Sequence, residues 1–248
     1  EMRKETAIAC LVNLFGGAIF GYNIGVVSGL TKPLIECTLF DESQHVPVSL
    51  YQGLFTSTIL VFATIGSPLG VWMSKKWGMK TSLITAGIIA TVFSIMAILV
   101  SNFWWVLTWR AILGLSLGFC SAVCPIYSSA IVDDSVKGRV ASTLQLFITF
   151  FILIGEVFNY LFVPSFDSEK CVPLTPLSWK MQIGFSAVFG VCLIITLLFG
   201  PNPKPGTKKV ASSLSLSGQE TMVNGQIVKN SLFSLKNIRW LFLAIMLA

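Results

Sequence analysis

Residues 7–30 have the sequence AIACLVNLFGGAIFGYNIGVVSGL and contain no charged side chain. A helix needs about 20 mostly apolar residues to cross the hydrocarbon core of a bilayer, so this stretch is long enough to span one. The apolar segment of a cleaved signal peptide has about 7–15 residues and precedes a small-residue cleavage site, and neither feature fits here. Residues 7–30 therefore predict a membrane-spanning helix and not a signal peptide.

The same pattern recurs along the chain. Uncharged stretches cover residues 46–74, 81–109, 111–132 and 181–203, and residues 140–166 contain a single acid, Glu156. None of these stretches alternates apolar and polar residues as the strands of a membrane barrel do. The expected fold class is an all-α membrane protein, with a bundle of six transmembrane helices over residues 7–30, 48–73, 81–101, 104–132, 140–163 and 180–200.

The composition of the whole chain agrees with this class. Of the 248 residues, 54% are hydrophobic and 11% are charged, whereas about a quarter of the residues in an average soluble domain are charged. So few charges cannot cover the surface of a soluble globule of this size. The same composition excludes a disordered chain, a secreted disulfide scaffold and a coiled coil.

One long polar stretch divides the chain. Residues 204–239 follow a proline-rich segment and show little periodicity, which indicates a cytoplasmic linker. A new apolar run starts at Trp240 and is cut off at Ala248. We expect a six-helix bundle over residues 1–203, a linker, and the start of a seventh span over residues 240–248. The chain is thus expected to be a fragment of a longer protein.

The basic residues predict the orientation of the bundle, because cytoplasmic segments of membrane proteins are enriched in Lys and Arg. With a cytoplasmic N-terminus, only Lys32, Arg110, Lys170 and Lys180 lie at or near the outer side. The net charge of +6 then faces anionic lipid of the inner leaflet, and we expect a multi-pass protein of the plasma membrane. No basic patch is interleaved with aromatic residues, so a nucleic acid is not an expected partner. The basic residues expected inside are Arg3, Lys4, Lys75, Lys76, Lys80, Lys137, Arg139, Lys204, Lys208, Lys209, Lys229, Lys236 and Arg239.

Two of the six cysteines, Cys37 and Cys171, fall in predicted outer loops. At a cell surface these loops face an oxidising compartment, and we expect a disulfide bridge between the two residues. No spacing of Cys and His fits a metal site, and neither a metal nor another cofactor is expected. Small apolar packing inside spans is the expected role of Cys10, Cys120, Cys124 and Cys192.

Polar side chains inside a span are costly and therefore indicate function. Gln145, Thr149, Glu156 and Asn159 are spaced so that they share one face of the fifth helix. Such a face either lines a solvated pathway or bonds to neighbouring helices. The amide of Gln145 suits a ligand rich in hydroxyl groups, because it offers donors and an acceptor. Glu156 is either a proton-coupling site, a protonated carboxyl or a group at the outer water interface.

Five short motifs occur in a definite order: GYNIGVVSG at residues 21–29, RAILGLSLG at 110–118, PIY at 125–127, KG at 137–138 and QL at 145–146. Together they resemble the sugar porter family of the major facilitator superfamily. The corresponding family motifs are G-Y-[DN]-x-G-V-[IV]-[SN]-G, R-x-x-x-G-x-x-x-G, P-x-Y-x-x-E, R-G and Q-L. The agreement in order and spacing extends over most of the chain.

The resemblance implies a facilitative transporter of hexose that works by alternating access. In this family two six-helix halves enclose the sugar, so the implied partners are the sugar, the bilayer and a C-terminal six-helix half. Gln145 is implied as a sugar contact, with Thr149, Asn23 and Tyr22 as weaker candidates. Structural roles in packing or bending are implied for Gly21, Gly25, Gly29, Arg110, Gly114, Gly118, Pro125 and Tyr127.

Departures from the family pattern carry information. Asn23 stands where proton-coupled relatives have Asp, and an amide does not exchange a proton near neutral pH, so uniport is favoured over symport. In the loop after the second helix, Val71, Lys75 and Met79 replace a Gly, an acidic or amide residue and an Arg. Ala130 replaces the Glu of P-x-Y-x-x-E.

In the family, the replaced basic and acidic residues belong to a group of charged side chains that resembles an inner latch, because they pair when the transporter opens outward. A substitute latch is one interpretation, in which acids near Ala130 pair with the lysines of the loop after the second helix. Solvated loop charges are the alternative, since exposed pairs contribute little. The residues of the predicted latch are Lys75, Lys76, Lys80, Asp133, Asp134 and Arg139.

Two other functions stay open at this point. A non-transporting sensor or scaffold is favoured by the altered latch and opposed by Gln145 and the glycine-rich first helix. A transporter of a polyol or another small solute is the second alternative. No nucleophile and base stand in a catalytic arrangement, so an enzyme is not expected.

Overall fold

Two compact units make up the chain, Glu1–Lys204 and Pro205–Ala248. The first unit contains all the described helices, and the second contains two short strands. The computed structural model describes residues 2–35, 48–100, 102–133, 135–162, 176–203, 222–223 and 226–227.

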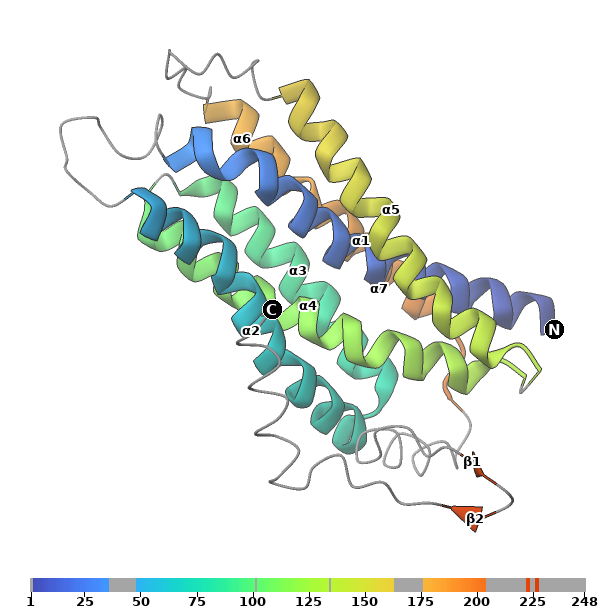
Figure 1. Cartoon of the computed structure of the whole chain (residues 1–248). Helices are drawn as coiled ribbons and strands as arrows, with labels where there is room; N and C mark the ends of the chain where they lie inside the picture. Colours follow the sequence, from blue (N-terminus) through green and yellow to red (C-terminus); the bar gives the residue numbers. More distant parts are fainter. Residues whose placement is uncertain are drawn as a thin grey trace. The chain divides into compact units, whose positions relative to one another are not determined.

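Helices are the regular elements of the first unit in its described part (Figure 1). Six helical segments are long and apolar enough to cross a membrane, and α6 with α7 forms the sixth of them. The predicted all-α membrane bundle of six spans is thereby confirmed. The helices are α1 (Met2–Leu34), α2 (Val48–Trp77), α3 (Met79–Leu99), α4 (Phe103–Ile131), α5 (Lys137–Phe162), α6 (Pro176–Gly184) and α7 (Ser186–Phe199).

Some helices extend past the apolar stretches that predicted them. α1 begins at Met2, earlier than predicted, and α2 continues to Trp77. An acid in the first turn and a base in the last turn interact favourably with the helix dipole, so charged flanks do not by themselves end a helix. Glu5 lies in the first turn of α1, and two lysines lie in the last turn of α2.

The sixth span is interrupted once, which was not predicted from the sequence. Phe185 separates α6 from α7. At this break the hydroxyl of Tyr22, on α1, donates to the main-chain carbonyl of Gln182 at 2.9 Å. A side chain that bonds into the carbonyl ladder is a recognised cause of a bend in a helix. The break is therefore linked to a contact between segments that are far apart in the sequence.

α1 and α4 lie at the centre of the first unit. In the apolar window of α4, 67% of the residues are buried, and 56% are buried in that of α1, against 28% in both α2 and α5. α1 packs along α5 and against α4 and α7, while α4 packs along α2 and α3 (Figure 1). α2 and α5 therefore flank the central helices and keep a large exposed surface.

Glycines permit two close helix contacts. At Gly21 of α1, a Cβ atom would overlap the main-chain carbonyl oxygen of Ile148 in α5. At Gly118 of α4, a Cβ atom would overlap the carbonyl oxygen of Ala63 in α2. Small residues allow membrane helices to approach until their backbones touch, which increases van der Waals packing. Two further motif glycines, Gly25 and Gly29, lie in the contact between α1 and α5. Gly114 lies in the contact between α4 and α2.

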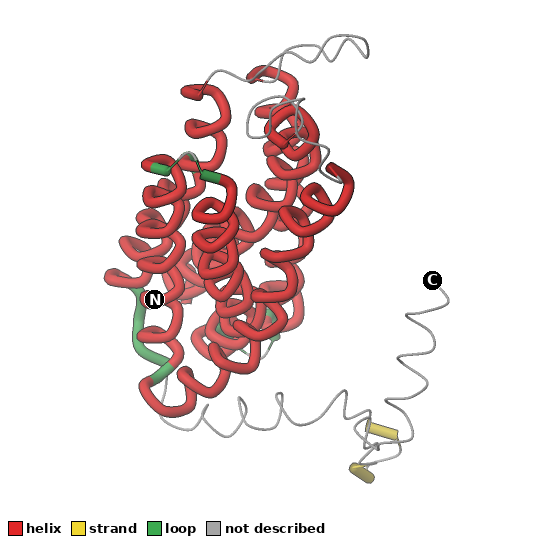
Figure 2. The backbone as a smooth tube through the Cα atoms, turned by 90° about the vertical axis from the view of Figure 1, so that its left-hand side faces the viewer, coloured by secondary structure: helices red, strands yellow, loops and turns green. Residues whose placement is uncertain are grey.

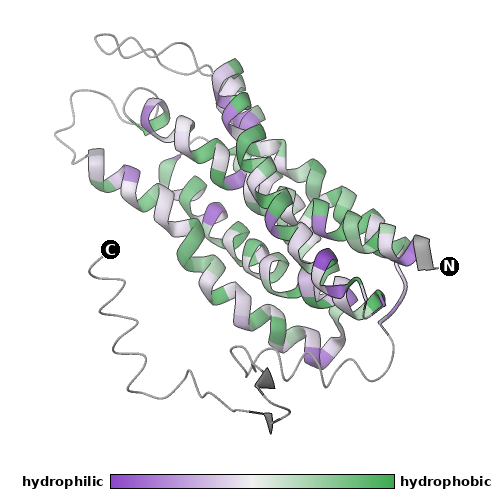
Figure 3. Cartoon of the chain, turned by 45° about the vertical axis from the view of Figure 1, so that its right-hand side comes forward, coloured by the Kyte–Doolittle hydropathy of each residue, from purple (hydrophilic) through white to green (hydrophobic). Residues whose placement is uncertain are grey.

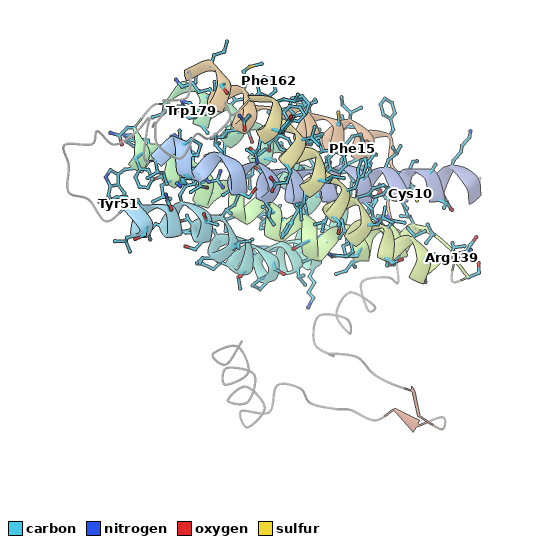
Figure 4. All side chains as sticks on the ribbon, turned by 45° about the horizontal axis from the view of Figure 1, so that its top comes forward. Cys10, Phe15, Tyr51, Arg139, Phe162 and Trp179 are labelled. Atoms are coloured by element: carbon cyan, nitrogen blue, oxygen red, sulfur yellow. The ribbon has the colours of Figure 1, made fainter. Side chains whose placement is uncertain are left out.

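Basic side chains gather at one end of the bundle. Figure 4 shows Arg139 toward one end and Tyr51 toward the other. At the Arg139 end, Lys80 of α3 donates to the carbonyl of Gly200 at 2.8 Å, which joins the start of α3 to the end of α7. Apolar residues predominate along the spans, and many of the hydrophilic ones lie near helix ends (Figure 3). We call this end the basic end, defined by Lys4, Lys75, Lys76, Lys80, Lys137 and Arg139.

Gly78 alone connects α2 to α3 at the basic end, and Figure 2 shows the described loops of this unit to be short. Its φ of 101° lies in the region that favours glycine. Its N–H donates to the carbonyl of Ser74 at 3.0 Å, and its carbonyl accepts from the N–H of Ser82 at 3.1 Å. The turn therefore continues the hydrogen bonding of both helices while reversing the chain.

The second unit is described only at two strands. β1 (Met222–Val223) and β2 (Gln226–Ile227) pair antiparallel, with Met222 opposite Ile227 and Val223 opposite Gln226. The rest of the predicted linker and the predicted seventh span lie outside the described residues.

Candidate functional site

The polar residues predicted on the fifth helix fall into two environments. Gln145, Thr149 and Glu156 are exposed along one side of α5, which we call the α5 polar strip. Polar groups in a span need a polar partner or water, so this side of α5 is suited to face a solvated space. The large apolar residues exposed on α5 include Leu146, Phe150, Leu153 and Val157.

Asn159, the fourth predicted residue, is buried against α1. Its Nδ2 donates to the main-chain carbonyl of Gly25 at 2.9 Å and lies 3.4 Å from Oε2 of Glu156. The hydroxyl of Ser28, on α1, bonds to Oε1 of Glu156 and lies 2.8 Å from the same Gly25 carbonyl. One end of the polar face thus bonds to a neighbouring helix, as one interpretation has it, and the other end is exposed; that it lines a solvated pathway stays a prediction.

Tyr22 and Asn23 lie inside the bundle and not on the α5 polar strip. Asn23 is 4% exposed, and its Nδ2 donates to Oγ of Ser186 in α7 at 2.8 Å. Ser94 of α3 lies 3.2 Å from the same Ser186 hydroxyl. These bonds join α1, α3 and α7. The structure therefore does not bring Tyr22 and Asn23 together with Gln145 and Thr149.

The ring of Tyr22 belongs to an aromatic cluster. Its centroid lies 5.6 Å from those of Phe158 and Phe185 and 5.5 Å from that of Phe189. Tilted and edge-to-face pairs of this kind add to the gain from burial. The cluster joins α1 to α5 and to the break between α6 and α7, and its members are too far apart in the sequence to be grouped from the sequence alone.

Asn13 connects three helices and was not singled out from the sequence. It is fully buried in α1, and its Nδ2 donates to the Val140 carbonyl at 2.7 Å and to Oγ1 of Thr143 at 3.0 Å, both in α5. Its Oδ1 accepts from Oγ of Ser128 in α4 at 2.7 Å. The available signal was an amide in the uncharged stretch 7–30, which is costly in a span unless it is bonded.

Replacing Asn13 by Ala is expected to destabilise the bundle by about 1–2 kcal/mol, because interhelical hydrogen bonds in membrane proteins are each worth up to about that amount. Thr143→Val is the matched control, since it removes one of these bonds and keeps the side-chain shape; it should cost about 0.6 kcal/mol. Thermal unfolding in detergent measures both. Equal unfolding temperatures for Asn13→Ala and the unchanged protein would contradict the proposed bridging role.

Gln182 is a second polar residue that sequence reasoning missed. It is fully buried on α6, and among the described residues neither its Nε2 nor its Oε1 has a hydrogen-bond partner. A buried amide in this condition lowers stability by the cost of its desolvation. It lies beside the break in the sixth span and one turn before Ser186.

Two lysines of the predicted inner latch contact neutral groups. Nζ of Lys76 lies 5.3 Å from the ring centroid of Trp72 and 5.4 Å from that of Trp77. Lys80 donates to the Gly200 carbonyl, as described above. Pairing with acids therefore stays a prediction. Of the other latch residues, Asp134 lies outside the described residues, and the exposed ones are Lys75, Asp133 and Arg139.

Arg110 and Tyr127 of the fourth-helix motifs are buried. The guanidinium of Arg110 lies 4.3 Å from the ring centroid of Phe55 in α2, which permits a cation–π contact. The hydroxyl of Tyr127 donates to the Pro201 carbonyl at 2.8 Å, just after α7. α4 continues through Pro125 without a break. These motif residues thus lie at contacts between elements and not on the α5 polar strip.

The predicted bridge between Cys37 and Cys171 falls outside the described residues. In the described spans the cysteines are free thiols, of which Cys120 and Cys124 are buried in α4. Cys124 lies against Gly16 of α1, where a Cβ atom would overlap its sulfur.

Known proteins resemble the chain over most of its length. A family model described as "Sugar (and other) transporter" matches residues 9–204. The chain is 29% identical over 198 residues to solute carrier family 2, facilitated glucose transporter member 10, of Xenopus tropicalis, covering 79% of this chain and 32% of that protein. It is 30% identical over 201 residues to the putative metabolite transport protein YwtG of Bacillus subtilis, covering 81% of this chain and 40% of that protein.

A solved structure shares the fold. The proton:xylose symporter XylE, bound to 6-bromo-6-deoxy-D-glucose, aligns with a TM-score of 0.69 at 20% identity, over 87% of this chain and 50% of that one. At this identity the likeness shows the fold alone, which is that of the N-terminal half of a major facilitator. The chain spans between 32% and 40% of the length of the two curated relatives.

Proposed function

This chain belongs to the sugar transporter family of the major facilitator superfamily, and from this premise we propose that it is the N-terminal half of a facilitative hexose transporter. Transport occurs by alternating access, as this bundle and a second six-helix bundle rock about a sugar site between them. The α5 polar strip faces that site, and the activity belongs to the complete protein.

The observation that supports a sugar as substrate is the exposed amide of Gln145. A sugar hydroxyl both donates and accepts hydrogen bonds. An amide side chain can pair with it in either direction, because its NH2 group donates and its oxygen accepts. Thr149, one turn away, donates to the main-chain carbonyl of Gln145 at 3.0 Å and keeps its oxygen lone pairs available as acceptors. The charged residues of α5 nearest to Gln145 are Arg139, about 9 Å along the helix axis, and Glu156, about 16 Å in the other direction, so neither lies beside the amide. The strip near Gln145 therefore suits a neutral, hydroxyl-rich ligand.

Asn23 supports uniport over proton symport. It occupies the position of the first-helix motif at which proton-coupled relatives have Asp, and its amide donates to Ser186. An amide neither binds nor releases a proton near neutral pH. The relatives named above include a facilitated glucose transporter and a proton:xylose symporter, so the choice between the two mechanisms rests on this residue.

The basic end is proposed to face the cytoplasm of a cell whose plasma membrane contains the protein, as expected for a concentration of Lys and Arg. Anionic lipid of the inner leaflet attracts such a surface. The inner latch would then close this end when the transporter opens outward. Lys76 and Lys80 would leave their contacts with Trp rings and with Gly200 to pair with Asp133 and Asp134.

Uptake of labelled D-glucose into liposomes that contain the complete protein tests the proposal. The expected result is saturable uptake that prefers D-glucose to L-glucose and stops at equal concentrations inside and outside. An imposed pH gradient should not drive accumulation. Accumulation above equilibrium in response to that gradient would contradict uniport and support symport.

The other functions predict different outcomes of the same assay. Uptake of a polyol without uptake of glucose would change the substrate and keep the mechanism. A folded protein that binds glucose and moves no solute would support a sensor or scaffold, an alternative that the altered latch residues Lys75 and Ala130 favour.

A further inference from the structure

We propose that the buried guanidinium group of Arg110 binds a chloride ion inside the half of the bundle opposite the basic end. Arg110 lies on α4, about 10 Å along the helix axis from Phe103, where the helix begins. The ring centroid of Phe103 lies 5.3 Å from that of Tyr51, at the end opposite Arg139 (Figure 4). The site belongs to the interior of the bundle, so it is separate from the exposed α5 polar strip.

Burial of Arg110 includes the atoms that carry its charge. The residue is 1% exposed, and among the described residues neither its Nε nor its Nη2 has a hydrogen-bond partner, although both atoms are buried. Nε carries one N–H group and Nη2 carries two. A buried donor without an acceptor lowers stability by the cost of its desolvation. These N–H groups therefore require an acceptor.

The charge of Arg110 also lacks an acidic partner in the described part of the chain. The acids there are Glu5, Asp133 and Glu156, and none of them bonds to Nε or Nη2 of Arg110. Glu5 lies at the basic end, and Asp133 follows the end of α4, about 30 Å from Arg110 along the axis. Glu156 is exposed on α5 and bonds to Ser28. A guanidinium group stays protonated in proteins, so loss of a proton does not remove its charge.

Phe55 compensates for only part of this charge. Its ring centroid lies 4.3 Å from the guanidinium carbon of Arg110, and Phe55 is itself fully buried in α2. The face of an aromatic ring attracts a cation, but the ring has no net charge with which to neutralise it. A buried charge is tolerated where an opposite charge accompanies it. Arg110 therefore needs a counter-ion that the described side chains do not supply.

The counter-ion has to fit inside this bundle. A second six-helix half would cover surface that is exposed here, whereas Arg110 is enclosed by the helices of this half. One turn further along α4, at Gly114, a Cβ atom would overlap the main-chain carbonyl oxygen of Ile59 in α2. The two helices thus touch beside Arg110 and leave little room. A small ion is required.

Chloride matches the donors, the charge and the room. Nε–H and one N–H of Nη2 lie side by side on one edge of the planar guanidinium group, and this fork can hold one anion with two hydrogen bonds. The single negative charge of chloride neutralises the single positive charge of Arg110. A monatomic ion also needs less space than a carboxylate or a phosphate group.

Unfolding of the complete protein in detergent tests the site. The protein is exchanged into sodium gluconate and then titrated with sodium chloride at constant ionic strength. Once chloride exceeds its dissociation constant, each tenfold increase should raise the ratio of folded to unfolded protein about tenfold, so the unfolding temperature rises with the logarithm of the concentration. Arg110→Met, a neutral side chain of similar length, should abolish this rise. In gluconate it should unfold at a higher temperature than the unchanged protein, because the uncompensated charge is gone.

Lys180→Met is the matched control, because Lys180 is also a cation placed over an aromatic ring. Its Nζ lies 5.4 Å from the ring centroid of Trp179, but the residue is only half-buried. Water can therefore solvate its charge, and no bound anion is needed. Lys180→Met should keep the chloride dependence of the unchanged protein.

A second measurement needs no variant to fold. Crystals of the complete protein grown in sodium bromide should show an anomalous scattering peak beside Nε and Nη2 of Arg110. Equal unfolding temperatures in chloride and gluconate would overturn the proposal, as would a chloride dependence that Arg110→Met retains or an anomalous map without bromide at Arg110. Failure of the complete protein to move sugar would refute the proposed function and leave both of these results unaffected.

Discussion

Replacement of Gly21 by Ala is expected to lower the free energy of unfolding of the bundle by about 1–3 kcal/mol, the usual cost of forcing an added group into a packed contact. The new Cβ atom would meet the main-chain oxygen of Ile148 and would lie 3.1 Å from the main-chain nitrogen of Ile152. Main-chain atoms of a helix cannot turn aside as a flexible side chain does. α1 and α5 would therefore have to separate along the contact that joins them.

Gly53→Ala is the matched control, because it adds the same methyl group to another span. No atom lies within 4 Å of the position that a Cβ would take at Gly53 of α2. Ala is the better helix former, so this change should stabilise the protein by about 0.5–1 kcal/mol. Thermal unfolding in detergent should thus move in opposite directions for the two variants. Shifts of the same sign would contradict the assignment of Gly21 to a backbone contact.

Replacement of Gln145 by Leu is expected to reduce glucose transport at low substrate concentration by about tenfold or more. A sugar hydroxyl that loses its partner in a closed site costs about 1–3 kcal/mol, and each 1.4 kcal/mol corresponds to a factor of about ten. Gln145 is exposed in this bundle, so the unfolding temperature should stay near that of the unchanged protein. Uptake assays and thermal unfolding on the same preparations separate loss of binding from loss of fold.

Thr149 and Thr85 form a matched pair for the same question. Each hydroxyl donates to the main-chain carbonyl four residues earlier at 3.0 Å, to Gln145 in one case and to Thr81 in the other. Thr149→Val should weaken transport by a smaller factor than Gln145→Leu, and Thr85→Val, on α3, should leave it unchanged. Equal transport by all three variants would remove the α5 polar strip from the sugar pathway.

Glu156 and Asn159 have partners on α1 that no helical pattern shows. The spacing of Glu156 and Asn159 placed both on the face that contains Gln145, but the side chains next to them on α1 decided their roles. Ser28 lies close to Glu156, and the Gly25 carbonyl lies close to Asn159, because the first helix has no bulky side chain at its glycine positions. A helical wheel gives the direction of a side chain from its own axis, and it contains no information about which neighbour stands there.

For Tyr22 and Asn23, too, the sequence did not show which groups their side chains would bond to. They lie in the motif that identifies the family, yet their hydroxyl and amide bond to α6 and α7, about 160 residues away in the chain. The identity of the motif was visible in the sequence. Whether its polar groups face a ligand or a helix depended on the packing of the sixth span, because a buried polar group takes whichever partner the fold brings to it.

The sequence by itself determined the class of the protein, the six spans and the family. Hydrophobicity over about 20 residues is a local property, and the motifs are short and ordered along the chain, so neither requires knowledge of a distant contact. Only the tertiary structure decided that Gln145 and Thr149 stay exposed while Asn159, Tyr22 and Asn23 are buried, and that Asn13 joins three helices. The physical reason is that inside a membrane every span is apolar and every polar group needs a partner, so the role of each polar group is set by the helix packed against it.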